Sequence, residues 1–307
     1  MPPKDEISAA RDRIAPYVRR TPISELRGFG LSYPVEMKFE QMQHTGSFKA
    51  RGAFNTLLSQ EVPEGGVVAA SGGNHGAAVA YAAARLGHRA RIYVPEIAGP
   101  AKMELIRSTG AELQVVKGAY AEAAARAAEW REATGAMEIH AYDAPTTVEG
   151  QGTCIAEWED QGLQADTVLI AVGGGGLIAG ALGWLSGARK VVAVEPERAC
   201  ALNAALVAGA PVDVEVAGVA ANSLGARRIG QICFDLAQVQ GIERVTVRDR
   251  NITLAQEALW REARQLVEPA GATALAALMS GAYKPEKDER VAVLICGGNV
   301  APDPLAS

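Results

Sequence analysis

A lysine among small and hydroxyl-bearing residues is the first group in this sequence whose chemistry stands out. Lys49 lies in the stretch Thr45-Gly-Ser-Phe-Lys-Ala-Arg-Gly-Ala53, just ahead of an amphipathic segment. A lysine in a partly apolar cleft has a lowered pKa, and its free amine can form an imine with a carbonyl group. Taken alone, the stretch is more often a solvated lysine at the start of a helix.

A second cluster places an asparagine and a histidine directly after a short apolar run. It reads Ser71-Gly72-Gly73-Asn74-His75 and precedes a helical pattern. The backbone N–H groups of such a turn, with the dipole of the following helix, suit a carboxylate or a phosphate. Two simpler roles compete, since Asn74 can cap the helix and His75 is more often a packing or hydrogen-bonded residue than a catalyst.

Four consecutive glycines follow another apolar run and open a further helix. The segment is Gly173-Gly174-Gly175-Gly176-Leu177. Glycines let the backbone close around a phosphate where any Cβ would intrude, whereas an ordinary flexible turn needs one or two of them. The segment therefore predicts an anion site.

The same glycines also allow a competing hypothesis. Gly174-x-Gly176-x-x-Ala179, followed by Glu195 at the end of the next apolar run, matches the dinucleotide fingerprint of glycines and a later acidic residue. This pattern favours an NAD-dependent oxidoreductase. Such an enzyme would leave the lysine and asparagine clusters without a role.

A fourth cluster, Cys296-Gly-Gly-Asn299, ends the last apolar run. Open α/β sheets present ligand-binding groups at this position, so the thiol can touch a cofactor ring, or it is a buried, inert cysteine. The four cysteines are scattered without a Cys-x-x-Cys pair, which argues against a zinc knuckle or a disulfide framework.

Short apolar runs alternate with helical patterns from Val67 onward, and they form two series. The first predicts strands at 67–70, 90–94, 113–116 and 137–140 with helices at 74–86, 101–108 and 120–133. Its helices are followed by the C-cap candidates Gly87, Gly110 and Gly135. The second predicts strands at 167–172, 191–195, 244–247 and 291–296 with helices at 176–186, 227–239, 253–267 and 271–281. We expect two open α/β domains with mainly parallel sheets.

Two finer predictions concern the second series. Thr253-x-x-Gln256 fits a capping box that opens the penultimate helix, and Pro269-Ala-Gly271 separates that helix from the last one. The segment 209–226, rich in Gly, Ala and Val, stays unassigned.

Composition excludes several classes of protein. The 307 residues are 49% hydrophobic and 21% charged, which excludes disorder and collagen-like repeats and suggests about two domains. A net charge of −5 without a block of like charge argues against nucleic-acid binding. Apolar runs fall far short of the roughly 18 residues of a membrane span, and the first residues lack a signal-peptide pattern. We expect a cytoplasmic protein with reduced thiols and no membrane partner.

Taken together and in this order, the clusters resemble the fold-type II pyridoxal-phosphate enzymes, specifically the serine/threonine dehydratase and serine racemase group. Gly150-Gln-Gly-Thr153 and Glu268-Pro-Ala-Gly271 add to the match, which spans nearly the whole chain. The resemblance implies the tryptophan synthase β-like fold. Residues 1–58 and 142–307 would form a large cofactor-binding domain, 59–141 a small substrate-side domain, and the cofactor would lie in the cleft between them.

The resemblance also implies roles for the clusters. Lys49 would carry pyridoxal 5′-phosphate, and the glycines from Gly173 to Gly176 would bind its phosphate. The residues Ser71 to His75 would hold the substrate carboxylate, with Asn74 near the 3-hydroxyl of the pyridine ring. Cys296 matches the position that faces the ring nitrogen. Phe48, Leu177 and Glu268 are further expected cofactor contacts, and the partner of Glu268 is open.

Residue identities narrow the expected reaction to elimination. Ala50 follows the lysine where cysteine and threonine synthases usually have Asp, and the tetraglycine differs from their Gly-Thr-Gly-Gly loops, which disfavours β-replacement. Gly72 stands where serine racemases place a serine hydroxyl as second base, so we expect little racemase activity. A neutral Cys296 thiol would not keep the ring nitrogen protonated, which disfavours a long-lived carbanion.

We therefore expect a threonine/serine dehydratase in which Lys49 removes the Cα proton and the β-hydroxyl leaves. L-Threonine or L-serine would yield 2-oxobutanoate or pyruvate plus ammonia. A hydroxyaspartate dehydratase, a serine racemase and a ligand-binding relative without activity stay open as alternatives.

Departures from the family bear on metals and regulation. The family's divalent site resembles Glu195 plus a later carboxylate, but Ala199, Cys200 and Ala201 follow, and Ala217-Gly218 stands where relatives often show Asp-Gly. We expect no divalent cation, because magnesium needs an oxygen-rich ligand set. A monovalent cation held by backbone carbonyls stays open. The family implies a homodimer, and the chain end at Ser307 predicts no C-terminal regulatory domain.

Overall fold

The strands form two separate sheets in a computed structural model that describes residues 4–118 and 120–300. The larger sheet has, in spatial order, β1 (Ile23–Leu26), β2 (Val35–Phe39), β10 (Val291–Ile295), β7 (Thr167–Ala171), β8 (Lys190–Pro196) and β9 (Glu243–Val247). The smaller sheet has β5 (Glu112–Val116), β4 (Ala90–Pro95), β3 (Val67–Ala70) and β6 (Met137–Glu138). Every pairing between these strands is parallel except β1 with β2, which confirms the prediction of two mainly parallel sheets.

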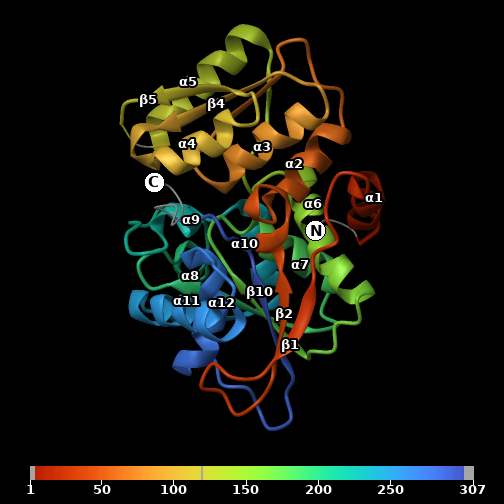
Figure 1. The fold of residues 1–307 in the computed structure, drawn as a ribbon, viewed down its shortest axis with the longest axis vertical. Coiled ribbons are helices and arrows are strands. Elements are labelled where there is room, and N and C mark those ends of the chain that lie inside the picture. The colour runs from red at the N-terminus through yellow and green to blue at the C-terminus, as the bar shows by residue number, and fades with distance from the viewer. Residues whose placement is uncertain (1–3, 119, 301–307) are drawn as a thin grey trace.

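Helices cover both faces of the smaller sheet, which lies above the larger one in Figure 1. They are α3 (Asn74–Arg85), α4 (Pro100–Arg107) and α5 (Tyr120–Thr134). Strand β3 shows why two layers form: Val67 and Ala69 pack with α3, while Val68 and Ala70 pack with α5. Successive strand residues point to opposite faces, so an uninterrupted apolar strand needs a cover on each side.

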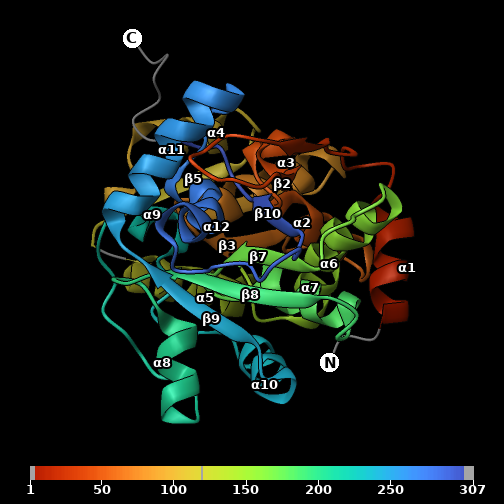
Figure 2. The ribbon, with the colours of Figure 1, turned by 90° about the horizontal axis from the view of Figure 1, so that it is seen from below.

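The central strands of the larger sheet are likewise buried on both faces. All residues of β2, β7 and β10 are buried. The helices around this sheet are α1 (Lys4–Ile14), α2 (Lys49–Leu58), α6 (Pro145–Asp160), α7 (Gly176–Leu185), α8 (Ala201–Ala208), α9 (Ala221–Leu224), α10 (Gln231–Gln240), α11 (Asp249–Ala263) and α12 (Pro269–Ser280). Figure 2 shows α11 and α12 on one side of the sheet and α7 and α10 on the other.

Several predicted boundaries were wrong; the helix predicted at 227–239, for example, begins four residues later, at Gln231. Helix α11 begins at Asp249, four residues before the predicted capping box, and the Thr253 hydroxyl donates back to the Asp249 carbonyl at 3.2 Å. An acidic residue in the first turn suits the helix dipole, which explains the earlier start. Gly271 lies inside α12 rather than between helices; residues 264–268 form the separator, and Pro269 is the first helical residue.

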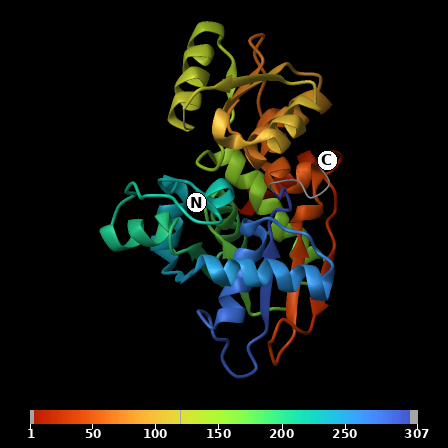
Figure 3. The same ribbon diagram turned by 60° about the vertical axis from the view of Figure 1, so that its left-hand side comes forward.

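The division into domains stays a prediction. The strands β3 to β6 fall within 59–141, and Figure 3 shows the orange-to-yellow segments of this part again lying above the blue C-terminal elements. Helix α2, which the prediction assigns to the large domain, packs Ala50 and Phe54 into the core beneath the small sheet. The chain ends at 1–3 and 301–307, on which the predictions about leader and regulatory segments depend, lie outside the described residues.

Candidate active site

Three of the predicted clusters lie at one edge of the larger sheet. Lys49 follows β2, Cys296 follows β10 and Gly173 follows β7. These three strands are parallel neighbours, so their carboxyl ends meet at the same edge. The strand order also reverses here, because β8 and β9 lie on one side of β7 and β10 lies on the other. Such a switch point is where open α/β sheets bind ligands.

The loop that carries Lys49 is held by the segment after β10. Ser47 pairs with Gly297 in an isolated antiparallel bridge, and the backbone N–H of Phe48 donates to the Cys296 carbonyl at 3.3 Å. Phe48 directly precedes α2, and its ring centroid is 5.1 Å from Nζ of Lys49. The lysine and cysteine clusters are therefore adjacent.

The side-chain amine of Lys49 loses its proton more readily than an ordinary lysine amine. Its Nζ donates to the Ala141 carbonyl at 2.7 Å. Burial lowers the pKa of this amine to about 8, although the fields of Cys296 and Glu268 act in the opposite direction. An appreciable fraction of the amine is uncharged near neutral pH, as a nucleophile or base requires.

A buried ion network anchors the helix on which Lys49 lies. Arg51 donates to both carboxylate oxygens of Glu40, at 2.8 and 2.7 Å, and its guanidinium lies 3.1 Å from Glu157. Glu157 also pairs with Lys38, and Lys38, Glu40 and Arg51 are almost wholly buried. Removal of one partner from such a network typically costs about 3–5 kcal/mol, because the other charge stays buried. The network thus joins α2 to β2 and α6.

Cys296 is buried and uncharged. Burial, followed by the field of Glu268, raises the pKa of its thiol above the ordinary value. The side chain can accept or donate a weak hydrogen bond but carries no charge at neutral pH.

The tetraglycine turn is shaped by contacts that exclude a side chain. A Cβ at Gly174 would overlap the ring of Tyr142, and one at Gly173 would lie 3.0 Å from Cα of Leu224. At Gly175 a Cβ would lie 2.5 Å from Sγ of Cys233. The turn can therefore hold only glycine, and Tyr142 and Cys233 are site residues that the sequence did not reveal.

This turn leads directly into the start of α7. Gly175 has φ +94°, a left-handed conformation that favours glycine, and α7 begins at Gly176. The buried Leu177 is the second helical residue. The first N–H groups of a helix have no intrahelical acceptor, so they form an anion site with the helix dipole behind them.

The asparagine of the second cluster does not cap its helix. Gly73 is the N-cap residue of α3 and Asn74 the first helical residue. The Asn74 amide instead donates to Glu268 and accepts a hydrogen bond of 2.8 Å from Nδ2 of Asn299. The structure thus brings together Asn74 and Glu268, which are both predicted site residues, and adds Asn299, whose position in the Cys-Gly-Gly-Asn segment was the available signal.

His75 is held as a neutral imidazole. Its Nε2 lies 2.8 Å from the Ile139 carbonyl, and burial, followed by the field of Lys49, lowers its pKa to about 3. An imidazole with this pKa stays unprotonated near neutral pH and is a weak general base. The Ser71 hydroxyl accepts from the Gly73 N–H at 3.2 Å, within the loop predicted to bind the substrate carboxylate.

Gly72 is packed against the neighbouring strand β4. A Cβ at this position would collide with the side chain of Ala98 and lie 3.0 Å from Cγ1 of Val94. The position therefore lacks room for a serine side chain.

The unassigned segment 209–226 lies against two of the predicted clusters. Its short helix α9 includes Asn222, whose carbonyl would be 3.7 Å from a Cβ on Gly73, and Leu224, which packs on Gly173. One segment therefore lies against both the asparagine turn and the tetraglycine turn.

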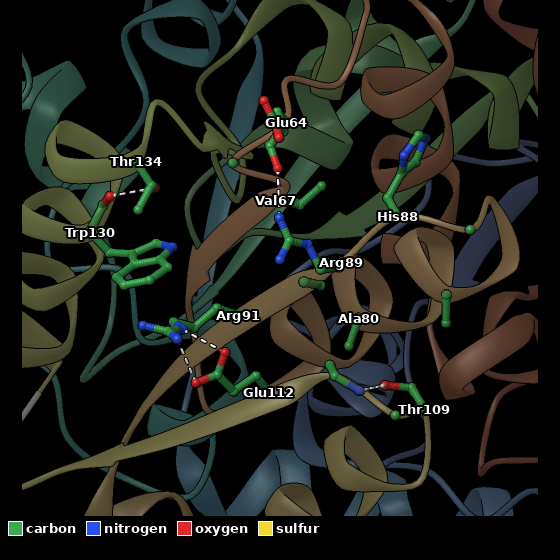
Figure 4. A pocket seen from close by; sticks show the side chains of 16 residues that line it. Glu64, Val67, Ala80, His88, Arg89, Arg91, Thr109, Glu112, Trp130 and Thr134 are labelled. Atoms are coloured by element: carbon green, nitrogen blue, oxygen red, sulfur yellow. Dashed lines mark hydrogen bonds and ion pairs between the residues drawn. The ribbon is translucent and has the colours of Figure 1, made fainter.

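A pocket of about 770 Å³ lies elsewhere, at the amino ends of β3, β4 and β5 (Figure 4). The Arg91 guanidinium stacks 3.4 Å from the ring centroid of Trp130 and pairs with Glu112. Because Ser71 to His75 follow the opposite, carboxyl end of β3, this pocket is separate from the site described above.

The geometry disfavours the dinucleotide hypothesis. Both carboxylate oxygens of Glu195 accept backbone N–H groups at 2.8 Å, from Leu202 and Asn203 at the start of α8. Burial raises the pKa of this carboxyl to about 7. Because the Glu195 side chain is almost wholly buried, it is not accessible to a ribose, which the dinucleotide role requires.

The described part of the chain has neither a cluster of metal-ligating side chains nor a helix suited to span a membrane. Residues 4–118 and 120–300 contain no group of three or more His, Cys, Asp or Glu side chains placed to hold a metal ion. Within the same ranges no helix has both the length and the apolarity to cross a bilayer.

Comparison with known proteins identifies the family. The model of the pyridoxal-phosphate dependent enzymes matches residues 14–297. A phenylserine dehydratase from Ralstonia pickettii is 35% identical, over 97% of this chain and 94% of that protein. The chain belongs to the pyridoxal-phosphate dependent enzyme family and is a lyase of that family.

Solved structures agree with this assignment. Maize serine racemase superposes with a TM-score of 0.91 at 29% identity, covering 97% of this chain and 94% of the other. A threonine deaminase from T.th. superposes with a TM-score of 0.89 at 35% identity, covering 98% and 99%. The fold-type II architecture expected from the sequence is confirmed.

Proposed function

We propose that this protein is a pyridoxal-phosphate dependent ammonia-lyase that dehydrates L-threonine or L-serine to a 2-oxo acid. The observation that carries the proposal is that Lys49, with a pKa of about 8, can act as a base near neutral pH, whereas Gly72 leaves no room for a second base. The similarity to a threonine deaminase and a phenylserine dehydratase supports a β-hydroxy amino acid as substrate.

The residues of the site fit the coenzyme. The tetraglycine turn leaves, at the start of α7, a cradle of N–H groups that a side chain would fill, and this suits a phosphate. Lys49 supplies an amine of low pKa at the same sheet edge. Cys296 supplies an uncharged group for the ring nitrogen, and Asn74 supplies an amide N–H for the ring hydroxyl. Phe48, Leu177 and Glu268 complete the proposed contacts.

Bound at Lys49, pyridoxal phosphate supplies an electron-withdrawing ring that acidifies the Cα–H bond of an attached amino acid. The Lys49 amine, freed when the substrate amine takes its place, would then take the Cα proton, and the N–H groups of the loop from Ser71 to His75 would hold the carboxylate. The β-hydroxyl would leave with one proton as water, and addition of water to the resulting enamine would give ammonia and a 2-oxo acid.

The bases available in the site favour elimination over racemisation. Removal and return of a proton on opposite faces needs two bases, whereas β-elimination needs one base on the Cα proton. His75 is neutral with a pKa of about 3, and Gly72 carries no hydroxyl. Lys49 is the base that the geometry supports.

Coenzyme capture should depend on pH through Lys49. Because only the uncharged amine attacks a carbonyl and its pKa is about 8, capture by the coenzyme-free protein should accelerate about tenfold from pH 7 to pH 9 and then level off. Stopped-flow absorbance of the coenzyme band measures the rate. A rise that continues to the ordinary lysine pKa near 10.5 would show that the cleft does not perturb the amine.

Gly72→Ser should destabilise the protein without creating a racemase. The new Cβ overpacks against Ala98 and Val94, a change that typically costs about 1–3 kcal/mol. Thermal unfolding and chiral chromatography of the serine product measure the two effects.

Gly73→Ser is the matched control for stability. Its backbone is extended (φ −128°), and a Cβ there would meet no atom closer than 3.7 Å, so unfolding should change little. Formation of D-serine by Gly72→Ser at a rate comparable with 2-oxo acid release would contradict the packing argument.

The decisive test of function is 2-oxo acid release by the purified, coenzyme-loaded protein. L-Threonine, L-serine, L-threo-phenylserine and 3-hydroxyaspartate are compared, with borohydride-treated protein as the inactive control. Release from threonine or serine above the other two supports the proposal. A preference for phenylserine or hydroxyaspartate would change the assigned substrate. No release from any of the four amino acids would contradict the dehydratase assignment.

The proposal also covers the oligomeric state of the protein and the cations that its activity requires. We propose a homodimer and no divalent-cation requirement, because the family resemblance implies the first and Glu195 is committed to α8. Light scattering gives the oligomeric state. Activity in potassium, sodium and chelator-treated buffers tests both kinds of cation.

A further inference from the structure

Three side chains from distant parts of the chain meet beside the candidate coenzyme site. Asn74 opens α3 in the upper unit of Figure 1, whereas Glu268 precedes α12 and Asn299 follows β10 in the lower unit. We call Asn74, Glu268, Asn299 and the carbonyl of Thr45 the asparagine clasp. It joins the two units through hydrogen bonds rather than through apolar contact.

The hydrogen bonds of the clasp use the Asn299 amide twice. Its Nδ2 donates to the Thr45 carbonyl at 2.7 Å and to Oδ1 of Asn74 at 2.8 Å. Nδ2 of Asn74 in turn donates to Oε1 of Glu268. The clasp therefore connects the loop that carries Lys49 to the first residue of α3.

Two glycines make room for this arrangement. A Cβ at Gly297 would collide with Oε1 of Glu268 and lie 3.2 Å from Nδ2 of Asn74. Gly46 has φ +75°, and a Cβ there would collide with Oδ1 of Asn299. The backbone around them is tied as well, since the Gly298 N–H donates to the Gly46 carbonyl at 2.9 Å.

The clasp allows the Asn74 amide one orientation. A flipped amide would place its oxygen against the Glu268 carboxylate and its NH₂ against the NH₂ of Asn299. Both contacts would be repulsive in a partly buried site, where unpaired polar groups are costly. An amide NH₂ has two donors, and Glu268 takes one of them.

We propose that Asn299 and Glu268 are positioning residues that orient Asn74, so that its second N–H serves an acceptor on the coenzyme ring. This inference rests on the proposed coenzyme site. The two residues act through Asn74, and they also hold the start of α3 against the Lys49 loop. Their loss should therefore alter coenzyme binding and local backbone protection together.

The test compares Asn299→Ala with wild type in two measurements. Titration of the coenzyme-free protein with pyridoxal phosphate should show affinity weakened about tenfold, the effect of losing roughly one hydrogen bond. Hydrogen exchange of residues 71–80 in the coenzyme-free protein should also accelerate. Asn251→Ala, on the outer helix α11, is the matched control and should change neither quantity.

A double-mutant cycle separates positioning from a merely structural role. If Asn299 acts through Asn74, Asn299→Ala should weaken coenzyme binding less than twofold in an Asn74→Ala background. The same tenfold loss in both backgrounds would overturn the proposal, as would unchanged affinity in Asn299→Ala. Glu268→Gln, which keeps the size of the side chain, is the second variant if Asn299→Ala does not fold, and it should weaken binding about threefold.

The two proposals fail in different ways. If wild type binds no coenzyme, the proposed function fails, and the exchange measurement still decides whether the clasp protects α3. If wild type binds the coenzyme but exchange and affinity in Asn299→Ala match those of Asn251→Ala, the clasp proposal fails alone.

Discussion

Lys49→Ala should lower kcat/KM for 2-oxo acid release by at least about 10³-fold, because general base catalysis alone is typically worth 10²–10⁴ and the covalent attachment point is lost too. The visible band of attached coenzyme should disappear in the same variant. A residual rate should be rescued in part by a small alkylamine, and rescue should grow with pH as more of the added amine is uncharged.

Lys190→Ala is the matched control for this substitution. Lys190 lies at the start of β8 and pairs with Glu243 at 2.7 Å, far along the sheet from the candidate edge. Surface pairs of this kind contribute little to stability, so activity and spectrum should match wild type. If Lys49→Ala kept a tenth of the wild-type kcat/KM, the role of Lys49 as base and as attachment point of the coenzyme would be contradicted.

Gly175→Ala should have the second largest effect, on stability and on coenzyme retention together. The new Cβ would lie 2.5 Å from Sγ of Cys233 and 2.8 Å from Cδ1 of Ile229, in a residue with φ +94°. Left-handed strain costs about 1–2 kcal/mol and overpacking adds about 1–3 kcal/mol. We expect a lower unfolding temperature and at least about tenfold weaker coenzyme binding, because the turn that holds the phosphate must move.

Gly162→Ala measures the cost of the left-handed backbone conformation alone. Gly162 has φ +91°, nearly the same conformation, but a Cβ there meets no atom within 4 Å. It follows α6, away from the tetraglycine turn. This variant should lose only the strain energy and keep wild-type coenzyme affinity. Equal unfolding temperatures for the two variants would show that Cys233 and Ile229 yield to the new side chain.

The local features of this protein could be predicted from its amino-acid sequence. Uninterrupted apolar runs predicted β3, β7 and β10, because strands buried on both faces need no polar alternation. Gly87, Gly110 and Gly135, predicted to follow helices, all have positive φ in the structure. The four glycines after β7 indicated a turn into a helix, since only glycine combines a left-handed conformation with close packing on every side.

Helix starts were less predictable than helix existence. The Thr253-x-x-Gln256 pattern predicted a capping box, but Thr253 lies inside the helix, which begins four residues earlier at Asp249. The extension places Ile252 in the core along with Ala255 and Leu259. Burial of a further apolar side chain outweighs the small preference for a cap at Thr253.

The tertiary structure alone decided the partners of the site. Asn74 lies 194 positions from Glu268 in the sequence and 225 from Asn299. No spacing pattern predicts contacts between residues so far apart in the chain. The ion network of Lys38, Glu40 and Arg51 likewise follows no pattern in the sequence, because it depends on the burial of these side chains beside Glu157. Local sequence sets which conformations a segment can adopt, whereas pairing of polar groups depends on which strand ends the sheet order brings together.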